Sequence, residues 1–263
     1  MYDYHTHSFF SDDSNTPMND MVSAAQSKGI REIAITDHYD PDYPDPNFPF
    51  IINFEKYHKA ITEAQKIFKG KIKVLRGVEI GIQHGNTLQK CKTAAKAYDY
   101  DFILGSFHST LGQDLYSAYF DHRSVEEGTE TYYAYMYDCL RQFNDYDVIG
   151  HFNVIDRYAS YVADYRPYMD IIEAILKLII TNGKGIEINT SSFRYNMGGV
   201  TTPSEAIFKL YQSLGGEIVT IGSDAHYAKH LGYMYDWAVE FMKHNRFRYL
   251  TTFEGRKPSF VKL

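Results

Sequence analysis

Residue types that bind metal ions follow short apolar segments along the whole of this 263-residue chain. Each segment is short enough to form a β-strand, and a helical pattern usually separates it from the next. If these strands are parallel, their carboxyl ends meet at one rim, and the residues that follow them gather there. The pattern therefore predicts a barrel with a cluster of metal ions at one end. The residues are His5, His7, Asp12 or Asp13, His38, Glu79, His108, His151, Asp224 and His226.

Strand and helix patterns alternate seven times in the sequence. Right-handed crossovers between parallel strands explain such an order, so we expect an α/β fold, a distorted (β/α)7 barrel forming one domain over residues 1–263. Two segments without helical periodicity, 39–50 and 110–126, are long enough to cover the functional face as loops. The expected strands span residues 2–4, 33–36, 72–78, 102–104, 148–149, 185–189 and 218–221.

The first helix shows how its boundaries are predicted. Thr16 is expected to be the N-cap residue and Pro17 the first helical residue, because proline tolerates that position. Met18, Met21, Val22 and Ala25 form its apolar stripe, and Gly29 follows its end.

Composition narrows the classes of function. The chain has 27 Lys and Arg against 33 Asp and Glu, a net charge of −6, and no basic stretch, which argues against polymeric nucleic acid as a partner. The apolar run 171–180 is too short to span a bilayer, and no signal peptide is visible. Only Cys91 and Cys139 could form a disulfide, so we expect a cytoplasmic protein without one. The oligomeric state cannot be predicted.

The ligand types indicate which metals and how many. His5 and His7 are two residues apart, so both imidazoles point to the same side of an extended segment, and Asp224 and His226 repeat this spacing. Imidazole and carboxylate together suit zinc, manganese or iron. Eight or nine ligands exceed the need of two ions, so we expect three divalent ions, with Glu79 able to bridge two. Any one of these residues could instead be a histidine or an acid at the rim of the barrel without a ligand role.

The motifs resemble those of the polymerase-and-histidinol-phosphatase (PHP) family over essentially the whole chain. They are His5-Thr6-His7, Ile35-Thr36-Asp37-His38, Gly77-Val78-Glu79, Ser106-Phe107-His108, Gly150-His151 and Ser223-Asp224-Ala225-His226. The resemblance implies a barrel with three metal ions. It assigns His5, His7, Glu79 and Asp224 to the first ion and Glu79, His108 and His151 to the second. His38 and His226 would bind the third, together with Asp12 or Asp13, where many relatives have a histidine.

The length of the chain resembles that of the stand-alone histidinol-phosphate phosphatases of this family. The resemblance implies hydrolysis of L-histidinol phosphate by a hydroxide that bridges the first two ions. Arg157 and Arg194, which follow the fifth and sixth strands, would bind the phosphate. Glu79, Asp224 and His226 would be the catalytic residues, and Asp224 or His226 would move the proton that the leaving alcohol needs.

Three other functions are compatible with these residues. The chain could hydrolyse nucleotides or other small phosphate monoesters with the same site. It could be a barrel of the amidohydrolase type that cleaves C–N bonds. Such sites often use a modified lysine at the end of a central strand as a bridge, and none of the predicted strands ends at a lysine. It could also be a metal-binding module without catalytic activity.

Overall fold

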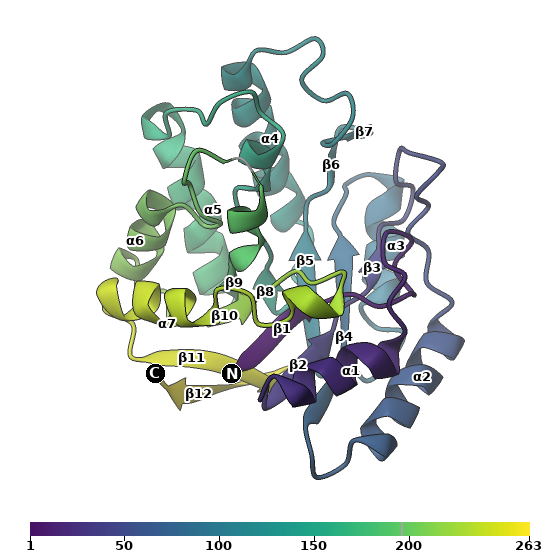
Figure 1. Cartoon of the computed structure of the whole chain (residues 1–263). Coiled ribbons are helices and arrows are strands. Elements are labelled where there is room, and N and C mark those ends of the chain that lie inside the picture. The colour runs from purple at the N-terminus through teal and green to yellow at the C-terminus, as the bar shows by residue number, and fades with distance from the viewer. Residues whose placement is uncertain (196) are drawn as a thin grey trace.

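A computed structural model describes residues 1–195 and 197–263 of the chain. At its centre is a parallel sheet in which each strand pairs with the next strand of the path β1-β2-β4-β5-β8-β9-β10 (Figure 1). The short strand β3 (His38–Tyr39) also pairs with β4, beyond the end of β2. The strands are β1 (Tyr2–Thr6), β2 (Glu32–Ile35), β4 (Lys73–Gly81), β5 (Phe102–Ser106), β8 (Val148–Ile149), β9 (Gly185–Asn189) and β10 (Val219–Gly222).

The first and last strands of this path meet just beyond β10. A parallel bridge joins Thr6 to Ala225, and the His7 amide donates to the Ala225 carbonyl at 2.9 Å. The sheet is therefore nearly closed, which confirms the predicted distorted seven-stranded barrel. Closure also brings the first and the last of the sequence motifs, near residues 5 and 226, to the same part of the rim.

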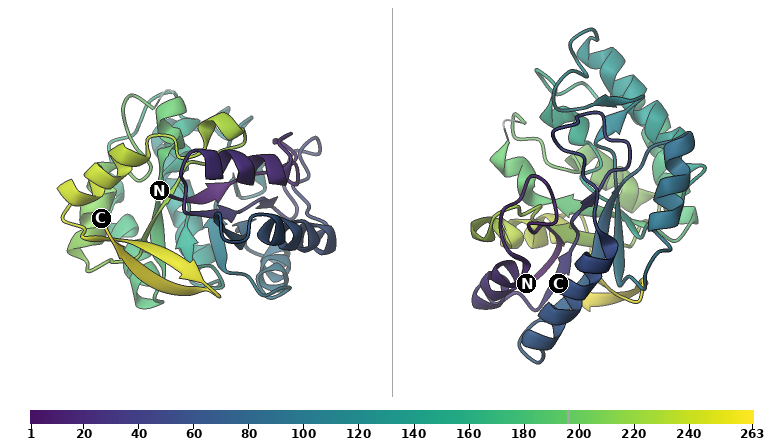
Figure 2. Two further views of the ribbon diagram at one scale, coloured as in Figure 1. Left: turned by 60° about the horizontal axis from the view of Figure 1, so that its bottom comes forward. Right: turned by 90° about the vertical axis from the view of Figure 1, so that its right-hand side faces the viewer.

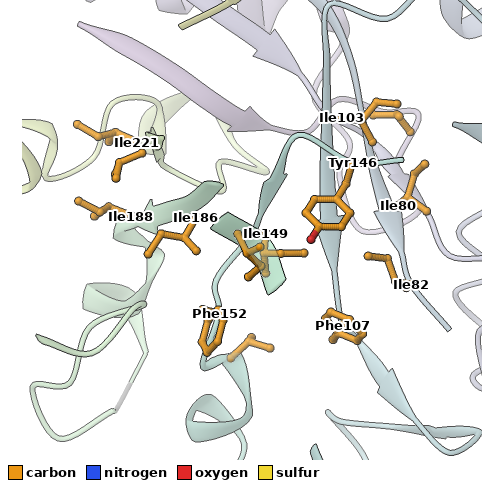
Figure 3. Close-up of a cluster of buried hydrophobic side chains, with 14 of the residues drawn as sticks. Ile80, Ile82, Ile103, Phe107, Tyr146, Ile149, Phe152, Ile186, Ile188 and Ile221 are labelled. Atoms are coloured by element: carbon orange, nitrogen blue, oxygen red, sulfur yellow. The ribbon is translucent and has the colours of Figure 1, made fainter. Parts of the chain in front are cut away.

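Helices cover the outside of the barrel. Figure 3 shows buried isoleucine side chains of β4, β5, β8, β9 and β10, among them Ile80, Ile103 and Ile188, on the outer faces of these strands. Aromatic side chains from segments next to β5 and β8, such as Phe107 and Phe152, pack in the same cluster. Among the described residues, no helix is both long and apolar enough to cross a membrane. The helices are α1 (Met18–Ser27), α2 (Phe54–Ile67), α3 (Asn86–Ala94), α4 (Val125–Leu140), α5 (Met169–Thr181), α6 (Glu205–Ser213) and α7 (Tyr235–His244).

Two boundary predictions were wrong in ways that matter for the site. Helix α1 begins at Met18, after Pro17, and the Thr16 hydroxyl donates to the His226 carbonyl instead of capping the helix. Strand β4 continues to Gly81, so Glu79 lies within the strand and not after its end. The apolar stripe of α1, from Met18 to Ala25, is buried as predicted.

The barrel interior has an apolar layer toward the amino ends of the strands, the lower layer, and a polar layer toward their carboxyl ends, the upper layer. The lower layer contains Tyr4, Ala34, Leu75, Phe102, Leu104 and Val148. Because side chains alternate along a strand, Leu75 and Glu79 share the inner face of β4, four residues apart. In β1 the register shifts between Asp3 and Thr6, which lets the neighbouring residues Tyr4 and His5 both contact interior side chains.

A C-terminal hairpin of β11 (Tyr249–Glu254) and β12 (Lys257–Lys262) was not predicted. It lies across the lower end of the barrel, as the left view of Figure 2 shows. The Phe253 side chain is buried against Tyr4 and Phe102, with ring centroids 6.3 and 5.1 Å away, and the Phe253 amide donates to the Tyr4 hydroxyl at 2.8 Å. The hairpin therefore closes the apolar layer from below.

We predict that Phe253→Ala lowers the free energy of unfolding by about 3–5 kcal/mol, because it removes a buried aromatic side chain and leaves a cavity. Phe260→Ala on the same hairpin is the control, since that side chain is 49% exposed, and it should change stability by no more than about 0.5 kcal/mol. Urea unfolding of both variants measures this. Equal effects would show that the hairpin does not close the barrel interior.

Candidate metal centre

The Glu79 carboxylate is fully buried and is the common contact of five of the candidate ligands. Ser106 donates a hydrogen bond to its Oε1 at 2.6 Å. Five imidazoles surround it, from the ends of β1, β3, β5 and β8. They belong to His5, His7, His38, His108 and His151, with N···O distances of 3.2, 3.6, 3.0, 3.3 and 3.1 Å respectively.

Asp224 faces Glu79 across His5 and His7. Its Oδ1 lies 3.8 Å from His5 Nε2 and 3.5 Å from His7 Nε2. Two ligands at about 2.1 Å from one tetrahedral ion lie about 3.4 Å apart, and the distances in this group scatter around that value. The spacing therefore suits a metal ion between these four groups better than it suits direct hydrogen bonds.

The neighbouring residues Asp12 and Asp13 contact different parts of the structure. The Asp13 Oδ2 atom lies 2.9 Å from His226 Nε2 and 3.7 Å from His38 Nε2. The Asp12 Oδ2 atom instead accepts a hydrogen bond from the Phe50 amide at 2.7 Å. His7, His38 and His226 also bring ligand nitrogens within 4.8 Å of one another. The geometry thus places Asp13 with the cluster and Asp12 with the loop at 39–50.

Several of the imidazoles are oriented through their second nitrogen. His5 Nδ1 lies 2.8 Å from Glu187 Oε1, and His108 Nδ1 lies 2.7 Å from Asp40 Oδ1. Such a contact requires a proton on Nδ1, since a carboxylate only accepts, and it leaves Nε2 of a neutral ring free to bind a metal. In both residues Nε2 is the atom that faces Glu79.

Buried polar atoms without hydrogen-bond partners support a metal at this site. Within the described residues, several atoms lie near a neighbouring ligand group but make no hydrogen bond of suitable geometry, including His5 Nε2, His7 Nε2, His38 Nδ1, Glu79 Oε2 and His226 Nε2. Burial of such polar atoms is unfavourable unless a hydrogen-bond partner or a bound ion engages them. Nitrogen and oxygen donors that converge in this way fit divalent ions such as zinc, manganese or iron.

Charges in the cluster shift the acid–base behaviour of its members. Burial would raise the pKa of Glu79, but His5, His38 and His108 outweigh it and hold that pKa well below its usual range. Burial and the neighbouring His226 and His38 lower the pKa of His7 well below its usual value. The first group is therefore a carboxylate and the second a neutral imidazole at neutral pH, which are the ligand forms that a metal ion requires.

The strand ends hold their ligands in unusual backbone conformations. Asp224 has φ 52° and is held from several sides. Arg194 donates to the Ser223 and Asp224 carbonyls at 2.9 and 2.8 Å, and the buried Asp3 carboxylate accepts from the Ser223 amide and hydroxyl. Below this turn, Gly222 lacks a side chain where an added Cβ would lie 1.9 Å from Glu187 Oε1.

A cavity of about 440 Å³ opens above the cluster. The segment at 39–50 contributes Tyr43, Asp45, Phe48 and Phe50 to its wall, and the second long loop contributes Asp114 and Tyr116. Tyr43 links the two loops, because its hydroxyl donates to Asp114 Oδ1 at 3.1 Å. Both loops predicted to cover the functional face therefore line this cavity.

The two arginines occupy different positions. Arg157 lines the cavity, with Nη2 2.7 Å from Ser191 Oγ and 3.5 Å from Asp224 Oδ2, and its guanidinium lies over the Tyr195 ring. Arg194 uses both terminal nitrogens for the backbone carbonyls beside Asp224. Both reach the predicted rim, but of the described residues that line the cavity only Arg157 is an arginine.

The sequence reasoning missed the groups that orient the ligands. Glu187 and Asp40 are buried acids that contact His5 and His108, and Glu187 also accepts from the His151 amide at 2.9 Å. Glu187 could have been found from its inward position in β9, because it alternates with Ile186 and Ile188, which lie in the outer core. No comparable sequence pattern predicted the contact between Asp40 and His108.

We predict that Asp13→Ala weakens binding of at least one divalent ion by about tenfold or more, because it removes a half-buried acceptor that faces two imidazoles. Asp12→Ala is the matched control. It should leave metal content unchanged and increase proteolytic cleavage within 39–50, because the Phe50 amide loses its partner. Elemental analysis after dialysis against a weak chelator, with limited proteolysis, measures both. Metal loss in Asp12→Ala with retention in Asp13→Ala would reverse the assignment.

Several known proteins are similar to this chain. A probable histidinol-phosphatase of Clostridium acetobutylicum is 35% identical over 236 residues, covering 88% of this chain and 89% of that protein. The histidinol-phosphatase of Lactococcus lactis is 29% identical over 265 residues, covering 97% and 95%. A crystal structure of the L. lactis histidinol phosphate phosphatase, complexed with zinc, L-histidinol and phosphate, superposes with a TM-score of 0.87 at 28% identity and covers 98% of each chain.

The sequence profile of the PHP domain matches residues 3–191, which is most of the chain. The profile includes Glu79 and all the candidate ligands except those that follow β10. Together with the barrel and its cluster of histidines and acids, this match shows that the chain belongs to the PHP domain family.

Proposed function

We propose that this protein is a phosphoric monoester hydrolase that uses divalent metal ions to convert L-histidinol phosphate and water into L-histidinol and phosphate. The observation that carries the proposal is the buried Glu79 carboxylate among five imidazoles beneath a cavity that contains Arg157. The L. lactis relative, whose crystal structure contains L-histidinol and phosphate, supports the choice of substrate. The reaction would serve histidine biosynthesis, and a cytoplasmic location fits that role.

We assign three ions to the ligands by proximity. His5, His7, Glu79 and Asp224 would hold the first, and Glu79, His108 and His151 the second. Asp13, His38 and His226 would hold the third. When bound, these ions would lower the pKa of a coordinated water, so that it can attack phosphorus, and would offset charge on the phosphoryl oxygens.

The protein's own groups would bind the phosphate and manage the proton. The Arg157 guanidinium presents N–H groups to the cavity beside Asp224, where they can donate to phosphoryl oxygens. Burial would raise the pKa of Asp224, but the positive charges of His5, His226 and Arg157 and the contact with His7 outweigh it and keep that pKa well below its usual range. Asp224 is therefore a carboxylate, which can accept the proton of the attacking water and pass it to the departing alcohol, with His226 as the neighbouring proton carrier. Arg194 would support this step by fixing the backbone of Asp224 and would offer its remaining N–H groups to the phosphate.

The wall of the cavity suits a cationic substrate with a planar ring. Asp45 and Asp114 place acidic side chains there, and Tyr43, Phe48 and Tyr116 are among the aromatic ones. Ammonium and imidazolium groups are attracted to both carboxylates and aromatic faces. L-Histidinol carries an amine and an imidazole, whereas a nucleotide brings further negative charge into this acidic wall.

We predict that L-histidinol phosphate exceeds nucleoside monophosphates and sugar phosphates in kcat/KM by about 100-fold or more, because the acidic wall favours a cation. A phosphate-release assay with the metal-loaded protein measures this. Comparable or faster release from nucleotides would instead support the alternative, a PHP phosphoesterase acting on nucleotides or other small phosphate monoesters.

We also predict that Arg157→Ala lowers kcat/KM by about 10²–10³-fold while metal content is retained, because a donor to the reacting phosphoryl group is lost. Arg157→Lys should recover only part of the activity, since lysine cannot form the two parallel hydrogen bonds of a guanidinium. Steady-state kinetics with parallel elemental analysis tests this. Unchanged kcat/KM in Arg157→Ala would remove the arginine from the mechanism.

A further inference from the structure

The hydroxyl of Ser11 lies at the back of the metal centre and contacts three groups. Its Oγ lies 2.8 Å from Asp37 Oδ1 and 3.1 Å from His7 Nδ1, and the His38 amide donates to it at 3.0 Å. Ser11 is fully buried, as are His7 and Asp37. It lies four residues after His7, in the turn that follows β1.

The direction of each of these hydrogen bonds follows from which groups can donate a proton and which can only accept one. Asp37 also accepts from the Ser8 amide at 2.6 Å and from the Ser8 hydroxyl at 2.8 Å, so it acts as a carboxylate that only accepts. The single hydroxyl proton of Ser11 must therefore point to Asp37. The two lone pairs of Ser11 then accept from the His38 amide and from His7, which places the proton of His7 on Nδ1.

This direction leaves the other nitrogen of His7 free. A neutral imidazole with its proton on Nδ1 carries a lone pair on Nε2. His7 Nε2 has no hydrogen-bond partner within the described residues and lies 3.6 Å from Glu79 Oε2 and 3.5 Å from Asp224 Oδ1. The lone pair is thus presented to the position proposed for the first ion.

We propose that Ser11 is a positioning residue, which together with Asp37 holds His7 in the tautomer that binds metal and ties His38 to the same turn. The inference rests on the proposed metal site. Ser11 differs from the other orienting groups because Glu187 and Asp40 contact His5 and His108 directly, whereas Asp37 acts on His7 through a hydroxyl. One hydroxyl therefore connects ligands from β1 and β3, and its loss should affect both.

Ser8 and Ser11 form a matched pair for the test. Each is fully buried in the same turn and donates one side-chain hydrogen bond to Asp37, but of the two hydroxyls only that of Ser11 forms a hydrogen bond with an imidazole. Ser11→Ala and Ser8→Ala should therefore lower the stability of the metal-free protein by similar amounts. Chemical unfolding without metal measures this, and it separates a general loss of packing from an effect on the ligands.

The decisive measurement is the affinity for Zn²⁺ alone, titrated into metal-free protein against a chromophoric chelator. Ser11→Ala should weaken at least one site by about 10–100-fold, and Ser8→Ala by less than about threefold. Nitrogen NMR of the metal-free protein, with the His7 signal assigned through His7→Gln, should show the proton on Nδ1 in the wild type and a mixture of tautomers in Ser11→Ala.

Two outcomes would overturn the inference: wild-type Zn²⁺ affinity in Ser11→Ala, or an equal loss of affinity in Ser8→Ala. Neither outcome would contradict the proposed function, which depends on wild-type binding and turnover. If the wild type itself bound no Zn²⁺ and hydrolysed no phosphate ester, the proposed function would fail first.

Discussion

The burial of one carboxylate, Glu79, is the constraint on which the rest of the structure depends. A charged group inside a barrel is strongly unfavourable unless opposite charges or metal ions compensate for it. Here five imidazoles and the Ser106 hydroxyl converge on it, from strands that are far apart in the sequence. That convergence requires the barrel to close, and closure depends on the bridge between Thr6 and Ala225.

The apolar and polar layers of the barrel depend on each other. The lower layer, with Phe253 beneath it, excludes water from one end of the interior and fixes the strands below the ligands. Above it, buried acids and hydroxyls such as Glu187 and Ser11 hold each imidazole in one orientation. Ligands whose second nitrogens are already engaged need little reorganisation when an ion binds, which favours tight and specific coordination. The cavity above then brings a substrate to this preorganised centre.

The sequence predicted the architecture and the members of the cluster well, because both follow from local patterns. Alternating strand and helix periods indicated the barrel, and ligand types near strand ends indicated the rim. The choice between Asp12 and Asp13 could not be predicted, since it depends on which carboxylate the turn directs to His226 and which to the Phe50 amide. The inward position of Glu187 could have been predicted from its alternation with Ile186 and Ile188, but its partner His5, 182 residues away, could not. The C-terminal hairpin was missed although Gly255 separates two strand-like segments.

The central claim is that Glu79 is shared by divalent ions held between it and the surrounding imidazoles. A crystal structure of protein purified without chelator, with data collected at the absorption edge of the metal it contains, tests this most directly. The account predicts anomalous peaks about 2.0–2.3 Å from the Glu79 carboxylate oxygens and from Nε2 of His5 and His151. Fully occupied protein that hydrolyses L-histidinol phosphate but shows no anomalous peak beside Glu79 would contradict it.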